Sequence, residues 1–171
     1  MTKHGIAEEG LLESLDRLRD RLQGRSTANP VVSLAEVLGW LYALEEHHRD
    51  GLGDGPYFAL RSASPEGQAL GGLIYARGLF THSLAEVAGL VTVRPGRTIT
   101  MGGGGGRRGR GGRGIVHRAA VTENSWKLLL ELPPPTRPET KGRDAYYRKH
   151  VEGKPVLPPI EAAVTFITGV L

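Results

Sequence analysis

The sequence predicts a mainly helical α+β fold, in which a bundle of about five helices carries an inserted antiparallel β-hairpin or three-stranded sheet. Three observations predict this class. Leucine-rich stripes recur at helical spacing as far as Val91. After Val91 polar residues alternate with apolar ones, a pattern typical of strands. Beyond the proline-rich connector "PPPTRPETKGR", the helical pattern returns.

Two amphipathic helices are expected first. Residues 5–24 carry an apolar stripe and are followed by the linker "GRSTANP". A second helix is expected over residues 33–50, opened by the capping box "SLAE" with Ser33 as the cap and Glu36 at the third position. We therefore divide the chain into residues 1–30, an N-terminal helix with its linker, and residues 31–171, one helical domain. The two stripes consist of Leu11, Leu15, Leu18 and Leu22, and of Leu34, Val37, Leu38, Leu41 and Leu44.

The third helix, expected from Ser64 to about Val91, has the clearest start. Ser64 is placed as the cap, Pro65 follows in the first turn, and Glu66 lies at the positive end of the helix dipole. Its residues are apolar on most sides, which predicts a central position in the bundle. Each glycine inside a helix costs about 1 kcal/mol relative to alanine. The interior glycines therefore predict the close approach of another helix; they are Gly71, Gly72 and Gly78.

A β insertion is expected over about residues 90–132. "LVTVRPGRTITM" resembles a hairpin that turns at Pro95-Gly96, and "GIVHRAAV" and "SWKLLLEL" have the composition of further strands. Between them, residues 102–114 are expected to form a flexible Gly/Arg loop. Two helices follow, "DAYYRKHVEG" ending at Gly153 and a last one that begins at Pro159.

Composition narrows the classes of function. The chain has no cysteine, which excludes disulfides, cysteine zinc sites and thiol nucleophiles. Adjacent His47 and His48 point about 100° apart on a helix and are not expected to chelate one metal ion together. We expect no metal site and no cofactor. No apolar run reaches the length of a membrane span, and the protein is expected in the cytoplasm without membrane contact.

The net charge of +4 comes from the Gly/Arg loop. This loop holds four arginines and no acid, and the remaining 18 basic residues balance 18 acidic ones. No lysine follows the glycines as in a P-loop. The loop resembles RGG-type segments, which would contact nucleic acid through phosphate attraction and arginine stacking. The missing aromatic residues favour the alternative, a solvated link between strands. The candidate nucleic-acid contacts are Arg107, Arg108, Arg110 and Arg113.

Arg77 is the sharpest candidate for chemistry because it falls at the centre of the apolar face of the third helix. A buried guanidinium needs compensation. It must therefore meet a carboxylate, reach solvent at a cleft, or cross a subunit interface. Glu45 and Glu46 of the second helix are the candidate partners. His82 follows five residues after Arg77, with Glu86 one turn further on, where it would accept from one ring nitrogen of the histidine.

Arg77 and His82, separated by four residues late on a helix, resemble the Arg-x(4–6)-His motif of HEPN domains. These are small, often dimeric helical bundles, and many are metal-independent ribonucleases of toxin–antitoxin and phage-defence systems. The resemblance implies that Arg77 steadies a phosphate and that His82 transfers a proton, with Glu46 or Glu45 assisting. It also implies a homodimer through helices 33–50 and 64–91, with RNA as the substrate.

The alternative is a non-enzymatic interaction protein with a protein partner, in which Arg77 and His82 have structural roles. A second resemblance does not decide between the two. "SPEGQALGGLIYARGLFTHSL", "ELPPP" and "YYRKHVEGKPV" are similar in order and spacing to short uncharacterised proteins of high-GC Gram-positive bacteria. That resemblance carries no known activity.

Overall fold

The computed structural model describes residues 3–79, 126 and 142–170, and within them the chain forms six helices and no strand. No helix in these ranges is long and apolar enough to cross a membrane. The helices are α1 (Lys3–Leu22), α2 (Pro30–Leu52), α3 (Asp54–Ala63), α4 (Pro65–Leu79), α6 (Arg143–His150) and α7 (Leu157–Thr168).

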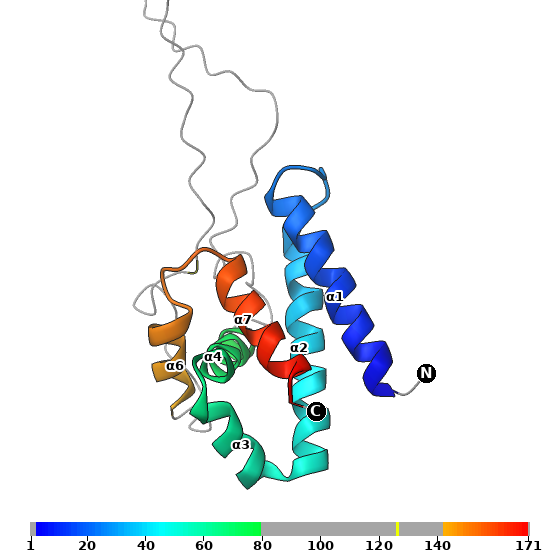
Figure 1. Cartoon of the computed structure of the whole chain (residues 1–171). Helices are drawn as coiled ribbons and strands as arrows, with labels where there is room; N and C mark the ends of the chain where they lie inside the picture. The colour runs from blue at the N-terminus through cyan, green and yellow to red at the C-terminus, as the bar shows by residue number, and fades with distance from the viewer. Residues whose placement is uncertain (1–2, 80–125, 127–141, 171) are drawn as a thin grey trace, which may run out of the picture.

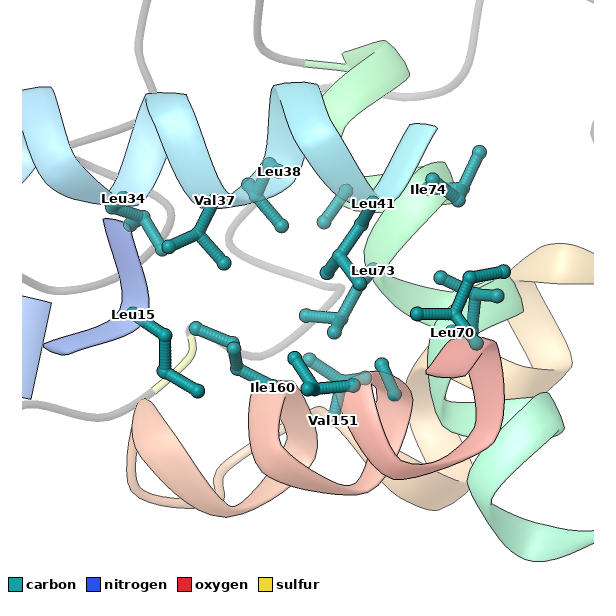
Figure 2. Packing of buried hydrophobic residues seen from close by; sticks show 14 of the residues in the cluster. Leu15, Leu34, Val37, Leu38, Leu41, Leu70, Leu73, Ile74, Val151 and Ile160 are labelled. Atoms are coloured by element: carbon teal, nitrogen blue, oxygen red, sulfur yellow. The ribbon is translucent and has the colours of Figure 1, made fainter. Parts of the chain in front are cut away.

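Helix α4 lies at the centre of the bundle, between α2 and α6, with α7 packed across it (Figure 1). Helix α1 lies along the outer side of α2, and α3 bridges α2 and α4 at one end of the bundle. Apolar side chains of α2, α4 and α7 converge in the interior (Figure 2). Three leucines of the α1 stripe, Leu11, Leu15 and Leu18, also belong to this core. The stripe residues that are fully or almost fully buried are Leu11, Leu15, Leu18, Leu34, Val37, Leu38, Leu41, Leu44, Leu70 and Leu73.

The predicted α+β class is wrong for the part of the chain that the structure describes, because that part is helical and contains no hairpin or sheet. The prediction depended on a short alternation of polar and apolar residues. Such a local pattern does not by itself form a ladder, which needs partner strands to satisfy its backbone groups. The predicted strands lie outside the described residues except for Trp126, and so does the Gly/Arg loop over residues 102–114.

Helix α2 starts earlier than its capping box indicated. The cap is Asn29, whose side-chain oxygen accepts a hydrogen bond from the backbone N–H of Val31 at 2.9 Å, and Pro30 occupies the first helical position. Ser33 is buried inside the helix. The predicted cap at Ser33 is therefore wrong, since Asn-Pro is the stronger start signal here. Helix α4, in contrast, starts as predicted: the hydroxyl of Ser64 accepts from the N–H of Gly67 at 3.0 Å.

Helix α3 was not predicted at all. The second helix was expected to end at residue 50, before "GLGDGP". In the structure the interruption is confined to Gly53, whose φ of 82° lies in the left-handed region. A new helix starts at Asp54, whose carboxylate lies in the first turn.

Two of the three glycines of α4 accommodate a neighbouring helix, as predicted. A β-carbon on Gly72 would lie 2.9 Å from the backbone N and Cα of Tyr147, and one on Gly71 would lie 2.9 Å from the ring of Tyr146. Both tyrosines belong to α6. Gly78 differs, because a β-carbon there would have no neighbour within 4 Å among the residues that the structure describes.

Alanine substitutions at Gly72 and Gly78 should therefore have opposite effects. Gly72→Ala places a methyl group against the backbone of α6 and should lower the free energy of unfolding by roughly 1–3 kcal/mol. Gly78→Ala meets open space at an exposed position and should raise it by about 0.5–1 kcal/mol. Urea unfolding followed by circular dichroism measures both. Equal effects of the two substitutions would contradict the packing of α6 on α4.

Candidate functional site

The structure brings together two of the three predicted catalytic residues on neighbouring helices. Arg77 lies in the last turn of α4 and Glu46 lies on α2, and both side chains are exposed. The third, His82, lies outside the described residues. The predicted nucleic-acid contacts also lie outside them; these are Arg107, Arg108, Arg110 and Arg113.

The guanidinium of Arg77 stacks on the ring of Tyr42, with its Cζ atom 4.2 Å from the ring centre. Tyr42 is half-buried on α2, one turn before Glu46. A hydrogen bond to the carboxylate of Glu46 raises the pKa of Tyr42, and partial burial raises it further, whereas the charge of Arg77 lowers it. We call Tyr42, Glu46 and Arg77 the Arg77 cluster. It joins the last turn of α4 to the surface of α2.

In the single chain the side chain of Arg77 is exposed to solvent, one of the three environments expected for it. The residues just before it on α4 are buried as far as Ala76, which is 0% exposed. Arg77 is therefore not sealed against a carboxylate in the core. Its aliphatic stem and guanidinium cover an aromatic ring, which gives the charge a favourable contact without desolvating it fully.

Glu45 is not the partner of Arg77. Its carboxylate is fully buried and forms an ion pair with Arg61 of α3, whose side chain is only 6% exposed. The guanidinium of Arg61 also lies over the ring of Phe58, with Cζ 4.8 Å from the ring centre. Sequence reasoning missed this pair because no helix was predicted between the second helix and Ser64. Helical spacing between Tyr57 and Arg61, both buried, was the available signal.

The surroundings of this buried pair are polar but incompletely paired. Around the pair, three buried atoms have no hydrogen-bond partner among the described residues: Oε2 of Glu45, Nε of Arg61 and the hydroxyl of Tyr57. Burial raises the pKa of Tyr57, and the nearby charge of Glu45 raises it further, so this hydroxyl stays protonated. We call Glu45 and Arg61 the buried ion pair.

The Arg77 cluster presents one exposed guanidinium, that of Arg77, and one exposed carboxylate, that of Glu46. A guanidinium presents a rigid fork of N–H donors that matches phosphate oxygens, and stacking on a ring leaves the edge of that fork available. The hydrogen bond between Glu46 and Tyr42 restrains the ring on which Arg77 lies. Among the described residues, no three histidine, aspartate or glutamate side chains are grouped so that they could hold a metal ion.

Comparisons of the chain with protein-family models, with curated proteins and with solved structures give no match. The function must therefore be argued from the residues themselves.

Proposed function

We propose that the protein is a HEPN-like RNA-binding protein that cleaves RNA without a metal ion, with Arg77 as the phosphate ligand and His82 as the proton-transfer group. The observation that carries the proposal is the exposed position of Arg77, stacked on Tyr42 beside Glu46. An arginine sealed in the interior against a carboxylate would have opposed it. Here the sealed arginine is Arg61, and Arg77 remains accessible to a ligand.

The proposed reaction is a transesterification. The ribose 2′-oxygen attacks the phosphorus and loses its proton, the bond from phosphorus to the 5′-oxygen breaks, and the leaving oxygen takes up a proton. Arg77 would neutralise the charge that develops on the phosphate oxygens. His82 would accept or donate a proton. Glu46 would act indirectly, by holding Tyr42 and through it the guanidinium.

A second copy of the chain is part of this proposal. The resemblance to HEPN domains implies a dimer that meets along the helices that contain Arg77 and Glu46. Both residues are exposed on α4 and α2, so a partner subunit could approach this surface. Two Arg77 clusters would then face one cleft, which would accommodate a phosphodiester between them.

The proposal is tested by incubating total RNA with the purified protein in the presence of EDTA. The wild-type chain should cleave RNA, and an Arg77→Ala/His82→Ala variant should lose the activity. Arg148→Ala is the matched control, because Arg148 is an exposed arginine on α6, away from the Arg77 cluster. It should retain wild-type activity.

Cleavage that is absent from the wild type, or equal in the wild type and the double variant, would contradict the ribonuclease. RNA binding without cleavage, lost with Arg77→Ala, would leave an RNA-binding protein. Neither cleavage nor binding would favour the non-enzymatic interaction protein.

A further inference from the structure

The buried ion pair lies where three helices meet. Glu45 belongs to α2, Arg61 to the last turn of α3, and the side chain of Arg61 packs against α4. A β-carbon on Gly71 would lie 3.5 Å from Nε of Arg61, and one on Gly67 would lie 2.2 Å from the backbone oxygen of Arg61. Gly67 and Gly71 are one turn apart and form a notch on α4 in which Arg61 is seated.

Stability alone gives little reason for this pair. Desolvation of two charges offsets much of their attraction, and apolar residues of similar volume are often as stable in such places. Oε2 of Glu45 and Nε of Arg61 have no hydrogen-bond partner, which makes the arrangement still less favourable than a fully paired one. An ion pair differs from an apolar contact in being directional. Its hydrogen bond requires a defined distance and angle and therefore favours one relative placement of the two helices.

The relative placement of α2 and α4 also determines the distance between Arg77 and Tyr42. Tyr42 lies one turn from Glu45 on α2, and Arg77 lies six residues beyond Gly71 on α4, roughly 9 Å along the helix axis. The stack of Arg77 on Tyr42 needs these two helices in one register. A slide of one helix by about 1.5 Å would lengthen the 4.2 Å contact but leave it within the roughly 6 Å range of a cation–π interaction, whereas a rotation of either helix about its axis would carry the guanidinium away from the ring.

We propose that Glu45 and Arg61 are positioning residues, which lock α2 to α4 through α3 and thereby hold the guanidinium of Arg77 over the ring of Tyr42. This inference uses the same surface as the proposed function, but it concerns the geometry of that surface and is tested without RNA.

The test replaces the pair by an apolar one, Glu45→Met/Arg61→Met, and measures the Arg77 side chain by NMR. A guanidinium stacked on a tyrosine ring shows upfield ring-current shifts of its neighbouring side-chain protons. The Tyr42→Leu variant removes the ring and defines the unstacked shift. The matched control is Arg19→Met/Glu161→Met, which removes an exposed ion pair between α1 and α7 with a distance of 2.9 Å. The midpoint of thermal unfolding is measured for every variant.

The expected result is a folded Met/Met variant with a thermal midpoint equal to or above that of the wild type, in which the Arg77 protons move to their positions in Tyr42→Leu. The control pair should leave them unchanged. An unchanged Arg77 shift in the Met/Met variant would overturn the proposal. So would a Met/Met variant that fails to fold, because the pair would then serve stability. RNA binding by these variants is measured separately. A wild-type protein that does not bind RNA would contradict the proposed function without affecting the positioning result.

Discussion

Replacing Trp126 with alanine is expected to lower the free energy of unfolding by about 3–5 kcal/mol, the range for truncation of a large buried aromatic residue. Trp126 is 1% exposed and belongs to the main core. Its indole N–H donates to the backbone oxygen of Val156 at 3.3 Å. The backbone N–H of Trp126 donates to the backbone oxygen of Lys154 at 2.9 Å, and the backbone oxygen of Trp126 accepts from the N–H of Gly153 at 2.9 Å. These contacts join Trp126 to the connection between α6 and α7.

Urea unfolding followed by the helical circular dichroism signal measures this loss. Trp126→Phe is the matched control, because it keeps an aromatic ring in the core while it removes the indole donor. It should lose less than the alanine variant, with about 1–3 kcal/mol attributable to the oxygen of Val156 left without its partner. A loss below about 1 kcal/mol for the alanine variant would show that Trp126 is not part of the core.

The helices that sequence could predict are those with long apolar stripes. In α1 and α2 the stripes are regular, and their leucines are buried as the spacing required, except Leu22 at the end of α1, which is only partly buried. In α4 the start signal at Ser64 and the glycines at the contact with α6 both had a direct physical meaning. The short α6 and α7 were placed to within a few residues by glycine and proline. A helix with a periodic apolar face must bury that face, and this requirement makes such helices predictable from the sequence.

Helix α3 shows where that reasoning ends. Its inward face is formed by Tyr57 and Arg61, a tyrosine and an arginine, so its residues carry no apolar stripe toward the core. Its outward side includes Leu60, which is 44% exposed. This helix therefore lacks the usual arrangement of apolar residues inside and polar residues outside. Its position is determined by tertiary contacts with α2 and α4. The helical spacing of Tyr57 and Arg61 can be read in "DGPYFALRSA", but the contacts with α2 and α4 cannot.

The same limit applies to the charged residues of the site. The sequence analysis named Arg77 as a candidate functional residue and Glu45 and Glu46 as its candidate partners. In the structure Glu45 pairs with Arg61 instead. Two arginines and two adjacent glutamates can be paired in several ways, and only the fold decides which of them are sealed. In the structure Arg61 is the sealed arginine, with a side chain 6% exposed, whereas Arg77 is exposed.

Arg61→Ala is expected to lower the free energy of unfolding by about 3–5 kcal/mol, because it leaves the carboxylate of Glu45 buried without a counter-charge. The chain supplies a close control in Arg49→Ala. Arg49 also lies over the ring of Phe58, at 5.2 Å, and it also binds a carboxylate, that of Asp54, at 2.8 Å. That carboxylate is 64% exposed, so removing Arg49 should cost only about 0–1 kcal/mol. Both values come from urea unfolding at neutral pH.

The comparison of Arg61→Ala with Arg49→Ala separates a buried counter-charge from an exposed one. Both arginines lie over the ring of Phe58 and bind one carboxylate, but the carboxylate of Glu45 is fully buried and that of Asp54 is exposed. Equal losses of stability in the two variants would contradict an ion pair sealed between α2 and α3.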